Sequence, residues 1–418
     1  MIIEQIRVID PSQNLDQVTD LFIQGDKLLA SPIPGDTERI DGRGLVAFPG
    51  LIDIHVHLRD PGLCYKEDIY TGGLAAAAGG FTTVACMPNT SPALDTPEQL
   101  RYVRDKAAEA AVRVLPIAAV TVGQKGETLT DFAALQSAGA VALSDDGMPV
   151  DSAALLRSAM QRAKALNLPI ISHCEDREMV QNFAVNEGIV SEQLGLPGRP
   201  TVAEAIQVAR DILLAEDTGA HVHIAHVSTA QSVELIRRAK ADGIRVTAET
   251  CPQYFILTEE ALFTQGTLAR VNPPLRAEKD RLAILAGLLD GTIDCIVTDH
   301  APHSAEEKGR ALSEAPSGMI GLETVLGLSL TALYHSGKLR LLEIARLMST
   351  APAQILGLPY GSLCPGQAAD ITLFDPEERW SVEPERFYSK ARNTPFGGME
   401  LRGRVRYTIR GGVIQYEA

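Results

Sequence analysis

The chain has 418 residues and a formal net charge of −15; 45% of its residues are hydrophobic but only 5% are aromatic. This length suits a barrel of about 250–300 residues with a smaller domain attached. The negative charge argues against nucleic acid and anionic membranes as partners, so an anionic substrate would need a local basic pocket. Scattered cysteines without a C-x-x-C pair, and no signal-peptide or membrane-spanning pattern, predict a cytoplasmic protein with reduced thiols.

Both ends of the chain have the composition of short strands separated by polar turns. Gly411 and Gly412 predict a tight hairpin near the C-terminus. We expect the two ends, residues 1–48 and 359–418, to pair into one small β domain. The expected strands there are 2–9, 20–30, 369–374 and 404–409.

Residues 49–358 alternate short apolar runs with amphipathic helical stretches such as 97–111 and 152–166. Eight strands alternating with helices predict an α/β fold, a parallel (β/α)8 barrel of the TIM type. Polar residues fall mostly at the C-terminal ends of the strands, where barrel enzymes place their active sites. The eight expected strands are 51–57, 82–86, 112–119, 140–144, 169–173, 222–226, 245–249 and 295–298.

Four histidines and one aspartate occupy such strand ends. His55 and His57 are two residues apart on the first strand, so both point to the barrel interior, where two imidazoles are hard to satisfy by hydrogen bonds alone. His173 and His226 end the fifth and sixth strands. Asp299 closes the eighth strand, where a carboxylate can bind a metal and exchange a proton with metal-bound water. This set suits one metal ion or two.

Three other histidines are assigned structural roles. His221 and His223 have the opposite strand parity to His226, so if His226 faces inward they should face the helices or lie in the preceding loop. The sequence around His335 predicts that it lies at the C-terminus of a helix.

Two metal ions need a bridging anion, and many barrels of this type use a carbamylated lysine from the fourth strand. No lysine occurs between Lys125 and Lys164. The bridge would therefore come from Asp145 or Asp146, or there is a single metal; a plain Asp-Asp-Gly turn is the competing interpretation.

The run 48–62, which contains the H-x-H pair, resembles the start of the barrel in dihydroorotases. The likeness continues in order along nearly the whole chain, and it is to the longer, bacterial type, in which an aspartate replaces the bridging lysine. The other matching segments are 87–90, 144–147, 173–176, 226–229, 271–276, 299–303, 365–370 and 393–396.

The resemblance implies reversible cyclisation of N-carbamoyl-L-aspartate to L-dihydroorotate in pyrimidine biosynthesis. A zinc-bound hydroxide would attack the ring amide, with Asp299 as general acid and base. Two zinc ions per chain are implied. Their ligands would be His55, His57 and Asp299 for one ion and His173 and His226 for the other, with Asp146 bridging both.

Arg59 is placed to grip the substrate carboxylate that does not react. The competing interpretation is a surface ion pair with Asp60 or Glu67. Asn89 and His303 would bind the same carboxylate, forming a carboxylate clamp with Arg59. Asn272 would form a hydrogen bond with the ring amide. The implied substrate contacts are His57, Arg59, Asn89, Asn272, His303, Ser317 and Gly318.

The chain departs from its relatives in three places near the substrate. Ser317 stands where relatives commonly carry a larger residue before Gly318, residues 251–254 replace a common Pro-His-His, and Cys64 lies in the loop after the first strand. These departures concern the loops over the substrate and the residues around the ligands, and all six implied ligands are present.

Two rival functions are kept open. Hydantoinases and allantoinases share the fold and the H-x-H pair, but they generally use the carbamylated lysine. Some dihydroorotase-like chains have lost metal ligands and serve as structural partners of aspartate transcarbamoylase, whereas all six ligands are present here. A homo-oligomer is expected, and an association with aspartate transcarbamoylase is left open.

Overall fold

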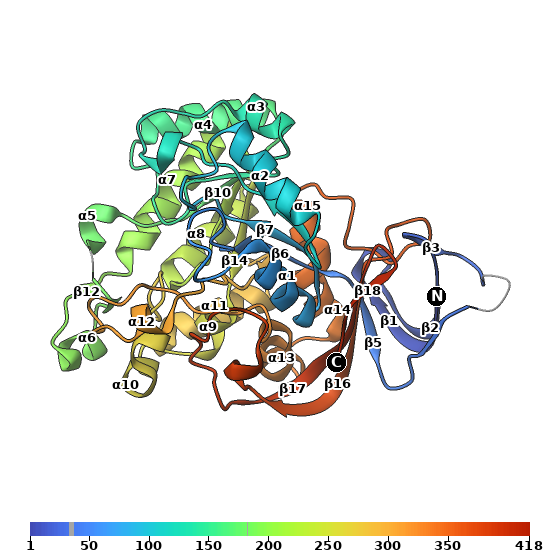
Figure 1. The fold of residues 1–418 in the computed structure, drawn as a ribbon. Helices are drawn as coiled ribbons and strands as arrows, with labels where there is room; N and C mark the ends of the chain where they lie inside the picture. The colour runs from blue at the N-terminus through green and yellow to red at the C-terminus, as the bar shows by residue number, and fades with distance from the viewer. Residues whose placement is uncertain (33–36, 182) are drawn as a thin grey trace.

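The computed structural model describes residues 1–32, 37–181 and 183–418. A barrel of parallel strands occupies the middle of the chain, with helices around it (Figure 1). All eight expected strands form, several of them shorter than predicted. They are β6 (Leu51–Val56), β7 (Phe81–Cys86), β8 (Arg113–Pro116), β9 (Leu143–Ser144), β10 (Ile170–Ser172), β13 (Val222–Ile224), β14 (Val246–Thr250) and β15 (Cys295–Ile296).

The strands pair in chain order in two runs, β6 to β8 and β9 to β15. A parallel bridge between Ala118 and Leu143 joins β8 to β9. A second bridge, between Val56 and His300, closes the circle, and the His57 amide donates to the His300 carbonyl at 2.9 Å. The predicted (β/α)8 barrel is therefore confirmed.

A helix follows each barrel strand. The first begins at an Asp68 cap, whose carboxylate accepts from the Thr71 amide at 2.8 Å. The predicted helix 97–111 ends at Ala107, and the predicted helix 152–166 forms almost in full. The helices after the eight strands are α1 (Ile69–Ala78), α2 (Pro97–Ala107), α3 (Phe132–Ser137), α4 (Ala153–Ala165), α7 (Val202–Thr218), α8 (Ala230–Ala241), α11 (Glu278–Leu289) and α13 (Val325–Ser329).

Shorter helices and strands lie in the loops that connect the main elements of the barrel, and after α13. Those between β10 and α7 project on the side opposite the terminal sheet (Figure 1). None of the described helices is long and apolar enough to cross a membrane. The shorter elements are α5 (Arg177–Val180), β11 (Val185–Asn186), α6 (Ile189–Leu194), β12 (Gly198–Arg199), α9 (Pro252–Ile256), α10 (Ala261–Gln265), α12 (Ala305–Lys308), α14 (Leu341–Ala345) and α15 (Ala351–Ile355).

Both ends of the chain build one sheet beside the barrel, as expected (Figure 1). Strand β5 pairs with β1 on one side and with β16 on the other, and Phe48 packs edge-on against Phe374 across that junction. The predicted hairpin turns at Gly411 and Gly412, both with left-handed φ angles. The exact domain boundaries stay a prediction. The sheet contains β1 (Ile2–Asp10), β2 (Leu15–Gln24), β3 (Lys27–Leu29), β4 (Arg39–Asp41), β5 (Val46–Pro49), β16 (Ile371–Ser381), β17 (Glu400–Arg410) and β18 (Val413–Glu417).

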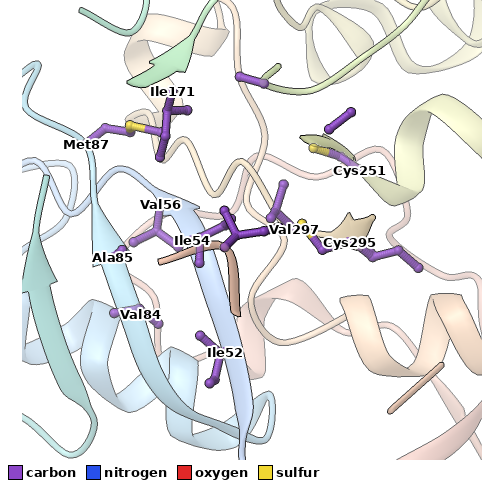
Figure 2. Close-up of a cluster of buried hydrophobic side chains, with 14 of the residues drawn as sticks. Ile52, Ile54, Val56, Val84, Ala85, Met87, Ile171, Cys251, Cys295 and Val297 are labelled. Carbon is purple, nitrogen blue, oxygen red and sulfur yellow. The ribbon is translucent and has the colours of Figure 1, made fainter. Parts of the chain in front are cut away.

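Strand alternation separates packing from chemistry along β6. Ile52, Ile54 and Val56 belong to the large hydrophobic core, part of which Figure 2 shows. The residues between them, Asp53 and His55, point to the opposite face and are fully buried polar groups. The first barrel strand therefore presents an apolar face to the core and a polar face to the barrel interior.

Candidate metal centre

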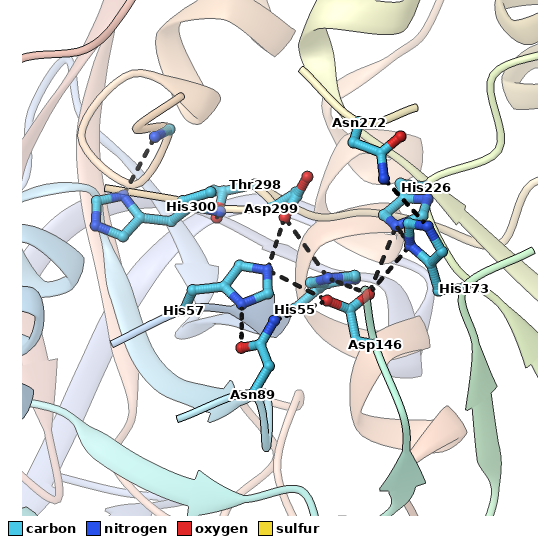
Figure 3. A network of polar contacts seen from close by, with 12 residues as sticks. His55, His57, Asn89, Asp146, His173, His226, Asn272, Thr298, Asp299 and His300 are labelled. Atoms are coloured by element: carbon cyan, nitrogen blue, oxygen red, sulfur yellow. Dashed lines mark hydrogen bonds and ion pairs between the residues drawn. The ribbon is translucent and has the colours of Figure 1, made fainter. Parts of the chain in front are cut away.

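Six polar side chains from five strand ends meet around Asp146 at the C-terminal mouth of the barrel (Figure 3). Because they are the predicted metal ligands, we call them the metal-ligand cluster. All six are less than a tenth exposed. Its members are His55, His57, Asp146, His173, His226 and Asp299.

One side of the cluster consists of His55, His57 and Asp299. The Nε2 atoms of the two imidazoles lie 3.5 and 3.6 Å from the two carboxylate oxygens of Asp146. The same nitrogens lie 3.6 and 3.0 Å from Asp299 Oδ1. Two imidazole nitrogens thus face two carboxylates, which is a donor set suited to a divalent cation.

The other side consists of His173 and His226. His173 Nδ1 and His226 Nε2 lie 2.9 Å apart, and they lie 3.5 and 3.6 Å from Asp146 Oδ1. Asp146 therefore stands between two pairs of histidines (Figure 3). Asp145 turns away, because its carboxylate accepts from the amides of Val120 and Thr121 at 2.8 and 3.1 Å.

Local backbone geometry aims several of these side chains. Arg59, His226 and Asp299 have φ angles of 59°, 31° and 47°, in the left-handed region that non-glycine residues seldom adopt. Such strain commonly occurs at functional sites, where surrounding structure holds it in place. The three residues follow barrel strands, so the chain turns sharply there and directs their side chains into the mouth.

The carboxylates in and around the cluster favour additional positive charge there, either as protons on the histidines or as a metal cation. Burial lowers the pKa of His173, but the hydrogen bonds and charges of Asp146 and Glu175 outweigh it and raise that pKa to about 10. Burial likewise opposes protonation of His55, yet Glu249 and Asp146 raise its pKa well above the usual value. His55 Nε2 and Asp146 Oδ1 are buried without a hydrogen-bond partner. These residues fit a metal ion of the kind that nitrogen and oxygen ligands hold, such as Zn²⁺.

Glu249, at the end of β14, is a functional candidate that sequence reasoning missed. Its Oε1 lies 2.5 Å from His55 Nδ1, on the ring edge opposite Asp146, and its Oε2 lies 3.0 Å from His223 Nε2. Burial alone would raise the pKa of Glu249, but His55 and His223 hold it below the usual range. An ionised carboxylate behind an imidazole fixes which ring nitrogen is free to bind a metal.

The prediction that His223 faces the helices or lies in the preceding loop was wrong. His223 is fully buried and contacts Glu249, which in turn contacts His55 inside the barrel. The parity argument failed because the strand ends at Ile224 and His226 adopts a left-handed φ, so His223 and His226 both point inward. His221 lies directly before β13, which agrees with the predicted place in the preceding loop, and its Nε2 lies 2.8 Å from Thr247 Oγ1. The predicted structural role of His335 agrees with its ring, which donates to the Pro376 carbonyl.

Arg59 lies beside the cluster, and its guanidinium forms no ion pair with any carboxylate among the described residues. Its Nε donates to the Pro302 carbonyl at 3.3 Å, and its Nη2 lies 3.4 Å from His303 Nε2. Within the described residues no carboxylate pairs with it: Asp60 accepts from Lys106 at 2.9 Å, and Glu67 accepts from the hydroxyl of Ser389 at 2.5 Å. The surface ion pair with Asp60 or Glu67 is therefore not formed.

The two predicted amide contacts approach the ligand imidazoles. Asn89 Oδ1 lies 2.9 Å from His57 Nδ1, and Asn89 Nδ2 donates to Asp146 at 3.4 Å. Asn272 Nδ2 lies 3.3 Å from His173 Nε2. Arg199, which sequence reasoning missed, donates to Asn272 Oδ1 and, at 2.9 Å, to Glu175. Asn89 is therefore nearer to the metal-ligand cluster than to Arg59, and its place in a carboxylate clamp stays a prediction.

His303, Ser317 and Gly318 form one wall next to Arg59. His303 Nε2 lies 2.9 Å from the Ser317 carbonyl. Gly318 has a φ of 136°, and a Cβ there would lie 2.7 Å from the Ala301 side chain and 3.1 Å from His303 Nε2. Any side chain at 318 would therefore clash with Ala301 and crowd His303. Their contact with substrate stays a prediction.

Comparison with known proteins identifies the family. Residues 44–232 match the family described as "Dihydro-orotase-like", and residues 313–416 match the "Amidohydrolase family". The dihydroorotase of Citrifermentans bemidjiense is 50% identical over the full length of both chains, and that of Pelotomaculum thermopropionicum is 51% identical over 97% of this chain and 96% of its own. The L-hydantoinase of Arthrobacter aurescens has the same fold, with a TM-score of 0.87 at 25% identity over 99% of this chain and 95% of its own. The chain is a hydrolase that belongs to the dihydroorotase family.

Proposed function

We propose that this chain interconverts N-carbamoyl-L-aspartate and L-dihydroorotate at the metal-ligand cluster, whose residues, with Asp146 at their centre, would hold two zinc ions per chain. The observation that carries the substrate assignment is the half-buried Arg59 guanidinium beside the cluster, which has no carboxylate partner among the residues that the structure describes. Dihydroorotate has a carboxylate that does not react, whereas neutral ring amides such as dihydrouracil have none. A planar guanidinium is suited to bind that carboxylate with two hydrogen bonds.

The chain's own residues supply binding and proton transfer. Zinc, when bound, supplies Lewis-acid activation of water and of an amide carbonyl. In the hydrolytic direction, Asp299 accepts a proton from the attacking water and returns it to the ring nitrogen that leaves. Arg59 and His303 bind the carboxylate. Asn272 forms a hydrogen bond with the ring amide, and Gly318, which has no side chain, leaves space for the ring. In the biosynthetic direction these roles are reversed.

The direct test uses the purified, zinc-loaded chain with two substrates. We expect the kcat/KM for dihydroorotate to exceed that for dihydrouracil by at least about 30-fold, the lower end of what one buried charge-assisted pair contributes. Elemental analysis should give two zinc ions per chain. A preference for dihydrouracil would favour a hydantoinase-like activity, and absence of turnover with metal bound would favour a purely structural partner.

We also propose, from family membership, that the chain forms a homo-oligomer and associates with aspartate transcarbamoylase. Light scattering of the chain alone and with that enzyme tests both statements. A monomer at micromolar concentration, or an unchanged mass in the mixture, would contradict the corresponding statement.

A further inference from the structure

A row of polar side chains, fully buried at its inner end and half-buried at its outer end, continues from His55 on the side away from Asp146. Glu249 Oε2 lies 3.0 Å from His223 Nε2, His223 Nδ1 lies 2.8 Å from Thr247 Oγ1, and that hydroxyl lies 2.8 Å from His221 Nε2. Glu249 and His223 are fully buried. We call Glu249, His223, Thr247 and His221 the histidine row. The proposed reaction uses none of them.

One arrangement of protons satisfies the entire row. An ionised Glu249 accepts from His55 Nδ1–H and His223 Nε2–H, so a neutral His223 accepts at Nδ1 from the Thr247 hydroxyl, which accepts in turn from His221 Nε2–H. Glu249 Oε1 also accepts from the His226 amide at 3.3 Å. One carboxylate oxygen thus serves both sides of the metal-ligand cluster, and His223 holds the other oxygen.

We propose that His223 is a positioning residue for the metal centre, which fixes Glu249 so that His55 presents Nε2 to the metal beside His57 and Asp299. A glutamate carboxylate rotates freely about its last bond unless both oxygens are held. Without His223, Oε2 would be buried without a partner, and the carboxylate would turn toward other donors. The orientation of the His55 ring depends on Oε1 staying in place. This inference rests on the proposed zinc centre.

The same contacts argue against a third metal site. His223, Glu249 and Cys295 lie close enough together to hold a cation. Both nitrogens of His223 and both oxygens of Glu249 are already occupied by hydrogen bonds, and burial raises the pKa of the Cys295 thiol well above its usual value. The row therefore acts as a protein scaffold and not as a ligand set.

The experiment measures zinc affinity without relying on turnover. Apo protein is titrated with zinc against a chromophoric chelator, for wild type, His223→Leu and His223→Gln. Loss of a ligand's hydrogen-bonded partner typically lowers metal affinity about 10- to 100-fold. Since His223 acts on His55 through Glu249, we expect the lower end, about 10-fold, for one of the two equivalents in His223→Leu. Glutamine can place an amide donor close to the position of Nε2, so His223→Gln should recover most of the affinity. His335→Leu, which removes a hydrogen-bonded histidine far from the site, is the matched control and should bind both equivalents normally.

The outcomes separate this inference from the proposed function. If wild type binds no zinc, the metal centre itself is wrong. If wild type binds two equivalents and His223→Leu binds both with the same affinity but has a lower Tm, His223 contributes only to stability and the inference fails. A third zinc equivalent in wild type would also overturn the inference. If His223→Leu does not fold, Thr247→Val keeps the shape and removes the hydroxyl behind His223, and a weaker loss of affinity, confined to one equivalent, is then expected.

Discussion

The barrel holds two clusters of histidines, the metal-ligand cluster and the histidine row, which differ in how their polar atoms are satisfied. In the metal-ligand cluster, His55 Nε2 and Asp146 Oδ1 lack partners, and the pKa of His173 is raised to about 10. In the histidine row, the side-chain contacts form a continuous chain, and burial with the nearby His223 and Arg245 lowers the pKa of His221 to about 4, so its ring is neutral.

This contrast separates metal ligands from structural histidines better than burial does. Both clusters contain buried histidines and buried carboxylates, so the burial of His55, His173 and His223 does not distinguish them. The difference is whether hydrogen bonds alone satisfy the polar atoms. Where several unsatisfied nitrogen and oxygen atoms lie together, as in the metal-ligand cluster, we expect a cation to complete the site.

The largest effect is expected from removing the residue at the centre of the metal-ligand cluster. Asp146→Ala deletes the carboxylate that faces all four ligand histidines, so at least one zinc per chain and nearly all activity should be lost. Elemental analysis and a dihydroorotate assay check this. Full zinc occupancy with normal turnover would show that the two clusters do not differ as proposed.

Asp299→Asn tests proton transfer while leaving an oxygen donor in place. We expect kcat to fall at least about 100-fold, the lower end of general acid–base contributions, with some metal retained. Steady-state kinetics and metal analysis on the same sample separate the two effects. Turnover close to wild type would place the proton transfer on another group.

Arg59→Met tests the free charge beside the cluster. Losing a buried charge-assisted pair costs about 2–5 kcal/mol, or roughly 30- to 5,000-fold in kcat/KM for dihydroorotate. Zinc content should stay unchanged because Arg59 is not among the ligands. The matched substrate is dihydrouracil, whose kcat/KM should change little; an equal loss for both substrates would argue against a carboxylate-binding role.

The smallest expected effect is a proton count. In the metal-free protein the raised pKa of His173 keeps that imidazole protonated at pH 8, and a metal ligand must be deprotonated. Zinc binding should therefore release at least about one proton per chain, and affinity should rise with pH by about tenfold per unit for each proton released. A pH-indicator titration in weak buffer measures this. If zinc binding releases no proton, the histidines of the metal-ligand cluster are already neutral in the metal-free protein, and the proposed contrast with the histidine row fails.

Most of the architecture could be predicted because local pattern determines it. Alternating apolar runs and helices predicted the eight strands, and the polar residues at their C-terminal ends predicted which side chains meet. Asp146 could be preferred over Asp145 only through the family resemblance; the structure shows the physical difference, since Asp145 is engaged by the amides of Val120 and Thr121.

The errors arose where backbone conformation or distant contacts decide. The left-handed φ of His226 is not visible in a one-dimensional pattern, and it misdirected the assignment of His223. Glu249 could have been found, because it is a carboxylate at the end of the predicted seventh strand. Arg199 left no such signal, since it comes from a loop strand and reaches Asn272 only in the folded chain.

The junction between β5 and β16 has a consequence for protein synthesis. Strand β5 runs into β6 through Gly50 alone. Among the described strands, the edge of β5 away from β1 pairs with β16, which is made more than 300 residues later. At translation rates of 5–20 residues per second, this edge stays uncovered for roughly 15 to 65 seconds. An unpaired apolar edge invites aggregation, so a ribosome that stalls before residue 371 leaves a nascent chain with an open sheet beside the first metal-ligand strand. Such chains are natural clients for chaperones that bind extended apolar segments.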